Sequence, residues 1–246
     1  MSNELATLNK LFSGKDSIVP TTKADEQAAL AKLSEGSTFL KRLQLYSRGK
    51  AIDKDYIAKG HFGTPTSKED IKDLGTSVDL IPLIRKAKAV DMSDRENIIV
   101  TNDVSSDEFK RICHNSDNTR DSGCVYGPSY LVYERSTGTF YEFFCQNKSA
   151  RVASAMINSY LPVSEDMIKN GLTDEKKPRG PKAFTAVAKL VEKGDWTWHV
   201  PSIEDCLTPF ESLPNEEQVL EEIQRFLKPE GGGVEAVDEP KGGRRR

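Results

Sequence analysis

The alternation of apolar and polar positions is clearest in the middle of the chain, between residues 129 and 146. Residues 129–135 and 140–146 are rich in aromatic and β-branched side chains, and a short turn containing Gly138 separates them. Two such segments around a glycine predict a β-hairpin. If Thr137-Gly138 is a two-residue loop, strand alternation divides the side chains between two faces. One face carries Leu131, Tyr133, Phe140, Glu142 and Phe144, and the other carries Tyr130, Val132, Tyr141, Phe143 and Cys145.

Both faces of this hairpin are apolar, whereas a strand face in water is normally polar. Two interpretations are open. Either the rest of the fold covers both faces, or one face is partly open and nucleic-acid bases stack on its rings. Arg135, Lys148 and Arg151 flank the hairpin and could contact phosphates in the second case.

Helical spacing of apolar residues follows the hairpin and recurs elsewhere. In residues 148–160 the spacing predicts a helix whose apolar face is Val152, Ala155, Met156 and Ser159. Further helices are predicted for residues 106–113, with Ser105 or Ser106 as cap, for 165–170, and for the amphipathic segment 215–227. Residues 2–34 predict two short helices that form an N-terminal arm.

Short apolar or alternating runs predict the remaining strands, at residues 39–46, 56–62, 78–89, 97–101, 184–191 (strand or helix) and 196–200. Pro82 lies near the middle of 78–89. Because proline has no donor for a ladder, this segment is predicted to be an edge strand or two strands joined at a bulge. In the last strand Trp196, Trp198 and Val200 share a face. Residues 68–74 are predicted to be a helical turn or a polar connection, and residues 115–123 a polar loop.

These elements predict a β-rich α+β fold, either an OB-like small barrel or a strongly curved antiparallel sheet, with an N-terminal helical arm and a C-terminal helix. The predicted parts are a helical arm at 1–37, a β-rich nucleic-acid-binding body at 38–206, an amphipathic helix segment at 207–229 and a disordered tail at 230–246. The tail is too polar and glycine-rich to fold alone.

Composition limits the class of protein. Of 246 residues, 37% are hydrophobic and 30% are charged, and no apolar run is long enough to span a bilayer. The first residues lack the pattern of a signal peptide, so a cytoplasmic location is expected.

The charge is uneven: residues 201–240 carry −9, the last six residues +4, and residues 1–200 only +2. An acidic C-terminal region behind a near-neutral body is common in single-strand binders and in ordinary solvated proteins.

The usual catalytic motifs are absent from the sequence. It has no GxxxxGK[ST], GxGxxG, GxSxG or HExxH pattern, and its three histidines are far apart. We therefore expect no enzyme and no cofactor. Free buried thiols are expected for the four cysteines, since the spacing of Cys113, His114 and Cys124 is not that of a zinc finger. Turns and strand caps are the expected role of four acids that could otherwise bind a metal, Asp79, Asp91, Asp94 and Asp103.

The layout of the chain resembles bacteriophage single-stranded DNA-binding proteins. It has an N-terminal arm, a β-rich body at 38–206 and an acidic C-terminal region, although the terminal Arg244-Arg245-Arg246 differs from the acidic tip of such proteins. The resemblance implies single-stranded DNA binding in replication or recombination, by aromatic stacking and phosphate contacts and without catalysis.

Residue type and strand placement select the candidates for such binding. For stacking they are Tyr46, Tyr56, Phe62, Tyr133, Trp196 and Trp198. For phosphates they are Lys41, Arg48, Lys50, Arg85, Lys86, Lys88, Lys148 and Arg151. Arg85, Lys86 and Lys88 are expected to form one basic stripe.

The expected partners are single-stranded DNA and, through the C-terminal segment, replication proteins; self-association is also conceivable, and no membrane is expected. The alternative is a structural or assembly protein, such as a virion or complex component, that does not bind nucleic acid. A metal-dependent nuclease is a third and weaker alternative.

Overall fold

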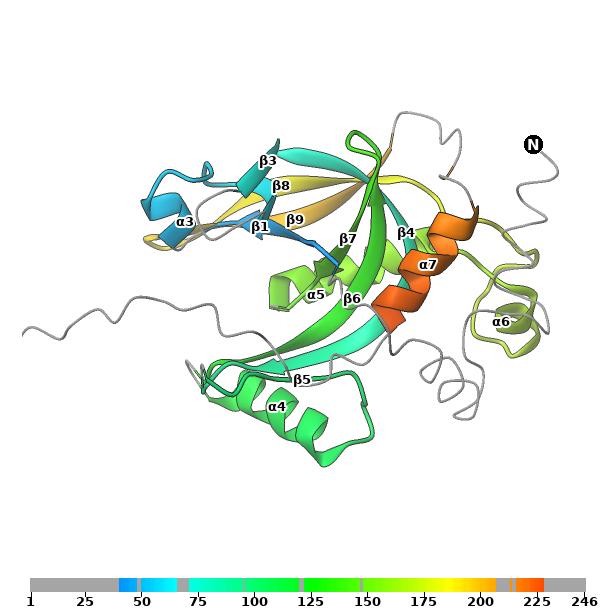
Figure 1. Ribbon diagram of the computed structural model, residues 1–246, viewed down its shortest axis with the longest axis horizontal. Coiled ribbons are helices and arrows are strands. Elements are labelled where there is room, and N and C mark those ends of the chain that lie inside the picture. Colours follow the sequence, from blue (N-terminus) through cyan, green and yellow to red (C-terminus); the bar gives the residue numbers. More distant parts are fainter. Residues whose placement is uncertain are drawn as a thin grey trace, which may run out of the picture. The chain divides into compact units, whose positions relative to one another are not determined.

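The computed structural model describes residues 40–47, 50–65, 71–94, 96–119, 122–146, 148–206, 213 and 216–227 (Figure 1). The predicted N-terminal arm, residues 1–37, and the predicted tail, residues 230–246, lie outside these ranges.

The described chain is a β-rich α+β fold, as predicted. Its strands are β1 (Arg42–Tyr46), β2 (His61–Pro65), β3 (Ile71–Gly75), β4 (Ser77–Asp91), β5 (Ile99–Thr101), β6 (Cys124–Glu134), β7 (Thr139–Phe144), β8 (Phe184–Lys193) and β9 (Trp196–Asp205). Its helices are α3 (Lys50–Asp53), α4 (Asp107–Asn118), α5 (Lys148–Ile157), the 3-10 helix η1 (Asn158–Tyr160), α6 (Glu165–Lys169) and α7 (Glu216–Leu227).

The strands form one large sheet in the order β3-β2-β1-β7-β6-β4-β8-β9, and β5 pairs with β4 beside this path. The sheet is mixed, because β1 runs parallel to β7, with Arg42 opposite Glu142 and Leu43 opposite Phe143. Over the described residues it is not closed. The predicted OB-like barrel is therefore not confirmed, and the predicted antiparallel sheet is corrected to a mixed one. A parallel neighbour cannot come from a hairpin, so the pairing of β1 with β7 had no local signal in the sequence.

The chain divides into two compact units. Of the described residues, those between 40 and 86 and between 127 and 227 form the first unit, and those between 87 and 126 form the second. β4 and β6 each contribute residues to both units. The proposed interface described below belongs entirely to the first unit.

The central hairpin is β6–β7, as predicted, but its loop is longer. Glu134 pairs with Thr139, which leaves a four-residue loop. A two-residue type I′ loop needs positive φ at both central residues. Gly138 has a φ of 63°, whereas Thr137 does not adopt positive φ, as expected of a β-branched residue. The Glu134 carboxylate stabilises the longer loop by accepting hydrogen bonds from the backbone N–H of Ser136 (2.9 Å) and Thr137 (2.8 Å).

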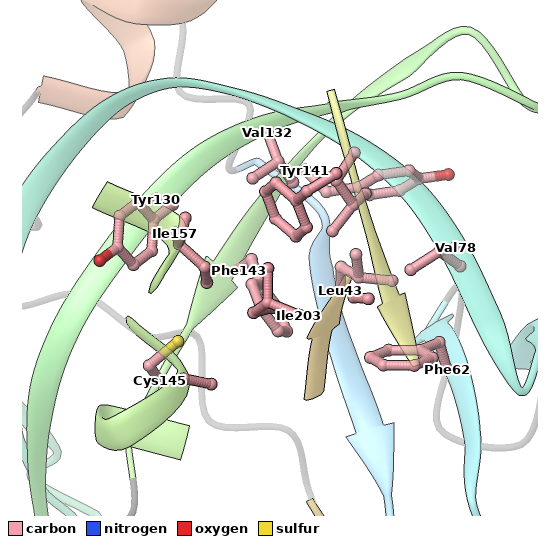
Figure 2. Packing of buried hydrophobic residues seen from close by; sticks show 14 of the residues in the cluster. Leu43, Phe62, Val78, Tyr130, Val132, Tyr141, Phe143, Cys145, Ile157 and Ile203 are labelled. Atoms are coloured by element: carbon pink, nitrogen blue, oxygen red, sulfur yellow. The ribbon is translucent and has the colours of Figure 1, made fainter. Parts of the chain in front are cut away.

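This register differs from the predicted one by two residues, so every side chain stays on its predicted face. The inner face of the hairpin belongs to the inner cluster, seen from close by in Figure 2. The cluster comprises Leu43, Phe62, Val78, Leu80, Tyr130, Val132, Tyr141, Phe143, Cys145, Ala150, Ala153, Ile157, Phe184, Ala186 and Ile203. Eight strands and helices of the chain thus contribute to one core.

Helix α5 covers the inner cluster with the opposite face from the one predicted. It buries Ala150, Ala153 and Ile157, while Val152 and Met156 are 74% and 51% exposed. The small side chains allow the helix to lie close to the sheet. Tyr130 reaches across this contact, and its hydroxyl lies 3.0 Å from the Ser154 carbonyl oxygen and 2.8 Å from the Asn158 side-chain oxygen.

The outer face of the hairpin is covered by α7, which Figure 1 shows in orange beside β4 and β6. The outer cluster comprises Ile81, Leu83, Leu131, Phe140, Val219, Ile223 and Phe226. The predicted amphipathic helix is thereby confirmed, and it buries the predicted face. Both faces of the hairpin are covered, so the first of the two interpretations of its apolar faces is confirmed.

Pro82 lies inside β4, which is one continuous strand and not two. On the side away from β6, β8 pairs with β4 from Ser77 to Leu80, and β5 pairs with it from Ala89 to Asp91. Pro82 falls between these two ladders, where a missing N–H costs no ladder bond. The prediction of an edge strand is thus correct only locally.

Three shorter predictions need correction. Residues 56–60 form turns, and strand β2 begins only at His61. Residues 71–75 form strand β3 and neither a helical turn nor a polar connection. Helix α4 has the predicted cap, because the Ser106 hydroxyl accepts from the Phe109 N–H, but it extends to Asn118 through polar residues that were predicted to be a loop.

The second unit has its own small core, in which Ile112 of α4 packs with Ala89 of β4 and Cys124 of β6. Beside it, the buried Asp91 carboxylate pairs with the Arg111 guanidinium at 2.9 Å. It also accepts hydrogen bonds from the N–H and hydroxyl of Ser93. Asp91 therefore closes the turn after β4, in agreement with its predicted structural role.

Candidate nucleic-acid interface

Three of the six aromatic candidates are packed into the protein. Phe62 is fully buried in the inner cluster, and Tyr46 on β1 is buried as well. Tyr133 packs against Phe140, with ring centroids 5.1 Å apart. The rings of Phe62 and Tyr46 are therefore not available for base stacking, because neighbouring side chains cover them. The half-buried ring of Tyr133 packs against the outer cluster.

The predicted basic stripe on β4 does not exist as one surface. Arg85 is exposed and donates to the Asn158 side-chain oxygen at 3.2 Å. Lys86 turns to the outer face, where its Nζ donates to the Phe226 carbonyl oxygen at 2.6 Å and lies 4.5 Å from that ring's centroid. Lys88 is fully buried in the second unit. The expectation of a shared phosphate groove is therefore wrong for these three cations, which strand alternation and burial separate.

The other candidates are scattered or lie outside the description. Lys41 is exposed before β1, and Arg151 is half-buried on α5. Tyr56 is half-buried, with the Lys54 ammonium 5.6 Å from its ring centroid. Arg48 and the side chains of Lys50 and Lys148 lie outside the described parts of the chain.

Trp196 and Trp198 are the candidates that the structure brings together on an accessible face. They lie on β9, the edge strand of the sheet, in a hairpin with β8. Trp196 is 73% exposed, and Trp198 is half-buried. A tryptophan so exposed in a folded protein is uncommon, and such apolar exposure often marks a binding surface.

Two lysines that the sequence analysis did not select share this face. Phe184 and Ala186 of β8 point into the inner cluster, so by alternation Lys189, Val191 and Lys193 lie on the outer face. The register places Lys193 opposite Trp196, Val191 opposite Trp198 and Lys189 opposite Val200. We call this set the Trp–Lys ribbon. The sequence contained a signal for this pairing. The turn at Gly194-Asp195 and the alternation of residues 196–200 indicate a hairpin, and extending it back along residues 184–193 would have paired the two lysines with the strand of the tryptophans.

The geometry of the Trp–Lys ribbon suits an extended chain of bases. Residues two apart on a strand are about 7 Å apart along it, which separates the two indole rings enough for successive bases of an extended strand. Lys189 and Lys193 are exposed and stand beside the rings. The nearby carboxylates are Asp195 in the turn and Glu204 at the far end of the same face. Lys59 lies on the other side of β9, because its Nζ is 3.4 Å from the hydroxyl of Thr197, whose side chain alternates away from the two tryptophans.

A separate cleft of about 910 Å³ lies between β4, η1 and the segment around α6. Its charged lining is mixed, with Arg85, Arg179 and Lys182 facing four carboxylates, Asp166, Asp174, Glu175 and Asp205. Arg179 is already engaged, since its guanidinium donates to the carbonyl oxygens of Leu161 and Ser159 and pairs with Glu175. This balance of charge does not favour a phosphate chain.

The four acids considered as metal ligands all have partners within the protein. Asp94 and Asp103 stabilise their own turns, whereas Asp79 lies inside β4 and bonds across to β8, so a turn or cap role is wrong for Asp79. Asp79 accepts from Thr185, Asp94 from Asn97, and Asp103 from Ser105, while Asp91 is held as described above. Over the described ranges, no three potential metal ligands converge, and no helix is long and apolar enough to cross a membrane.

Comparison with known protein families, with curated proteins and with solved structures finds no significant match to this chain.

Proposed function

We propose that this protein binds single-stranded nucleic acid on the Trp–Lys ribbon. The observation that carries the proposal is that both tryptophans of the chain lie on one accessible strand face, interleaved with cations of the neighbouring strand. Aromatic rings stack unpaired bases of any sequence, and lysines beside them hold the phosphates. A duplex offers no free base faces to such a ribbon.

Elementary magnitudes indicate binding that is modest and sensitive to salt. Stacking on an aromatic ring contributes about 1–3 kcal/mol per base. Two phosphates held by Lys189 and Lys193 would give log K a slope of about −1.4 against log salt for a single strand.

The proposal follows the layout resemblance to phage single-stranded DNA-binding proteins. A role in replication or recombination, and recruitment of replication proteins by the C-terminal segment, belong to the same proposal.

The first test is titration with a 30-nucleotide oligo-dT while intrinsic tryptophan fluorescence is recorded. Because both tryptophans of the chain are in the proposed site, quenching reports on this surface directly. We expect saturable quenching that weakens with salt and is not competed by duplex DNA. Trp196→Ala and Trp198→Ala should each weaken binding about 5- to 150-fold, as the loss of 1–3 kcal/mol implies; affinity of these two variants is measured by anisotropy of labelled oligo-dT.

A matched pair of charge reversals tests the phosphate contacts. Lys189→Glu with Lys193→Glu should weaken binding and flatten the salt dependence. Lys176→Glu with Lys177→Glu changes the charge equally at two exposed residues away from the ribbon and should have a smaller effect. Equal losses in both double variants would mean that only the net charge matters. Absence of binding at low salt by folded wild-type protein would reject the proposal.

One observation favours the rival function of an assembly protein. The face of α5 that carries Val152 and Met156 is apolar and exposed, as protein-binding surfaces often are. If oligo-dT does not bind and the protein self-associates with rising concentration, this surface becomes the first to mutate.

A further inference from the structure

The edge strand that carries the two tryptophans also contacts β1 and the segment before β2 on its side away from β8. We call these contacts, which lie around His199, Ser47 and Gly60, the seam. The His199 N–H donates to the Ser47 hydroxyl at 2.7 Å, which ties β9 to the end of β1. On the other side of the ring, Gly60 donates its own N–H to the Tyr46 carbonyl oxygen at 2.7 Å. The imidazole of His199 therefore lies between the edge strand and the segment that leads into β2.

Gly60 lies directly against the His199 ring in this seam, and its geometry favours glycine. It has a φ of 85°, which favours glycine. A Cβ at this position would also lie 2.7 Å from His199 Nε2. The backbone and the ring are thus in direct contact, and a side chain on Gly60 would push the ring and β9 away.

The ring is placed where a positive charge is unfavourable. Among the described residues, its buried Nδ1 has no hydrogen-bond partner. Protonation would place an N–H donor and a charge at this atom. The charged and titratable groups around it are Lys59 before Gly60, His61 after it, Tyr46 on β1, and Glu192 on the same face of β8. The His61 ring already pairs with the Asp73 carboxylate, which lies 2.9 Å from its Nδ1.

We propose that His199 is a positioning residue for the Trp–Lys ribbon and that its protonation loosens the seam and weakens nucleic-acid binding. This inference rests on the proposed function. The proposal predicts the direction in which affinity changes on protonation. Protonation of a histidine beside bound phosphates would ordinarily strengthen binding by adding a positive charge, whereas opening of this seam weakens it.

Burial, with a smaller contribution from the positive charge of Lys59, lowers the pKa of His199 below 6.5. The closed seam therefore holds fewer protons than the open one, and it is most stable above pH 6.5. As the pH falls below that value, the open form gains protons first and its share increases. Between pH 7.5 and 5.5 the gain is at most about tenfold, the factor set by an open-state pKa near 6.5.

The experiment measures two quantities on the full chain over pH 7.5–5.5. The first is affinity for the 30-nucleotide oligo-dT. The second, without oligonucleotide, is the protection factor of the His199 amide, which corrects for the intrinsic pH dependence of exchange. In wild type we expect the protection factor to fall by up to about tenfold, and the affinity to fall by a smaller factor that equals the loss of the closed form. Both should stay level in His199→Gln. His114→Gln removes a histidine of the second unit and should behave like wild type.

Glycine variants give an independent check if His199→Gln does not fold. Gly60→Ala should weaken binding already at pH 7.5 and remove most of its pH dependence. Gly75→Ala is the matched control, because Gly75 has nearly the same φ, 82°, but no atom within 4 Å of its added Cβ. Similar losses in both variants would assign the effect to backbone strain and overturn the proposal.

The outcomes separate the two proposals. If no oligonucleotide binds at any pH, the proposed function fails, and the protection factor alone decides whether the seam is pH-sensitive. If binding occurs but is constant or stronger at pH 5.5 in wild type, the role of His199 in positioning the ribbon is overturned.

Discussion

At the scale of single residues, Asp91 is the group whose titration the structure determines most clearly. The Ser93 hydroxyl, the Ser93 N–H and Arg111 all bond to its ionised form and lower its pKa to about 2 from 3.8. Since the pKa is depressed in the folded protein, the stabilisation is complete above about pH 4 and is lost as the pH falls through about 2. The shift corresponds to about 2 kcal/mol.

We therefore expect Asp91→Asn to lower the free energy of unfolding by about 2 kcal/mol at pH 6 and to have a much smaller effect near pH 2. Denaturant titrations of both proteins from pH 6 to pH 2 measure this. Asp107→Asn, at a fully exposed position of the same unit, is the control. A deficit in Asp91→Asn that stays constant down to pH 2 would show that the lost stabilisation does not come from the ionised carboxylate.

The cations of β4 show why individual site residues were hard to predict. In the sequence Arg85, Lys86 and Lys88 look like one stripe, but consecutive residues of a strand face opposite ways. That rule alone separates Arg85 from Lys86. The position of Lys86 depends on α7, whose Phe226 is 140 residues away, and no local pattern contains that information.

At the scale of elements, the period of the apolar residues predicted the buried face of helix α7 correctly and that of helix α5 wrongly. In α7 the apolar residues occupy one face and acids the other. In α5 two faces are apolar, one with large side chains and one with alanines. The sheet buries the face with the alanines, and helical periodicity alone gives no reason to choose it over the face with the larger side chains.

Removal of the central contact of α7 tests its contribution to stability. Ile223 is fully buried in the outer cluster, so Ile223→Ala should lower the free energy of unfolding by about 2–5 kcal/mol. Chemical denaturation checks the value, and Glu221→Ala on the exposed face of the same helix should cost less than 1 kcal/mol. If Ile223→Ala costs no more than Glu221→Ala, α7 does not stabilise the sheet.

At the scale of the whole molecule, the packing of the described residues determines where a ligand can bind. The inner cluster occupies one face of the sheet, and α7 packs on the other face against β4, β6 and β7. Within the described part of the chain, the outer face of β8–β9 is left exposed, with its two rings and neighbouring lysines. An interface limited to one hairpin contacts only a few nucleotides.

A short contact predicts how affinity depends on oligonucleotide length. We expect oligo-dT of about five nucleotides to bind nearly as tightly as a 20-mer, once the number of overlapping sites on the longer strand is taken into account. Isothermal titration with dT3, dT5, dT10 and dT20 measures this. A steady gain in intrinsic affinity up to 20 nucleotides would point to a long groove and to surfaces other than the Trp–Lys ribbon.

The fold as a whole could be predicted only in part. Local patterns predicted the central hairpin, the strand with the tryptophans, α6, α7 and the cap of α4. The partners of β1 and β4 could not be predicted, because parallel pairing and long-range order are decided by the packing of segments far apart in the chain. Trp196 and Trp198 were selected as candidates from the sequence, but Lys189, Lys193 and His199 needed the register.

The loop of the central hairpin has a further consequence. Its apolar pattern is satisfied equally by the observed pairing and by one displaced by two residues, because both put the same side chains on the same faces. Burial of rings cannot choose between them. The choice falls to the loop itself. Thr137 disfavours the positive φ that the two-residue loop needs, and the Glu134 carboxylate accepts hydrogen bonds from the N–H groups of Ser136 and Thr137 in the four-residue loop. The alignment of two core strands is thus set by residues that lie outside the core.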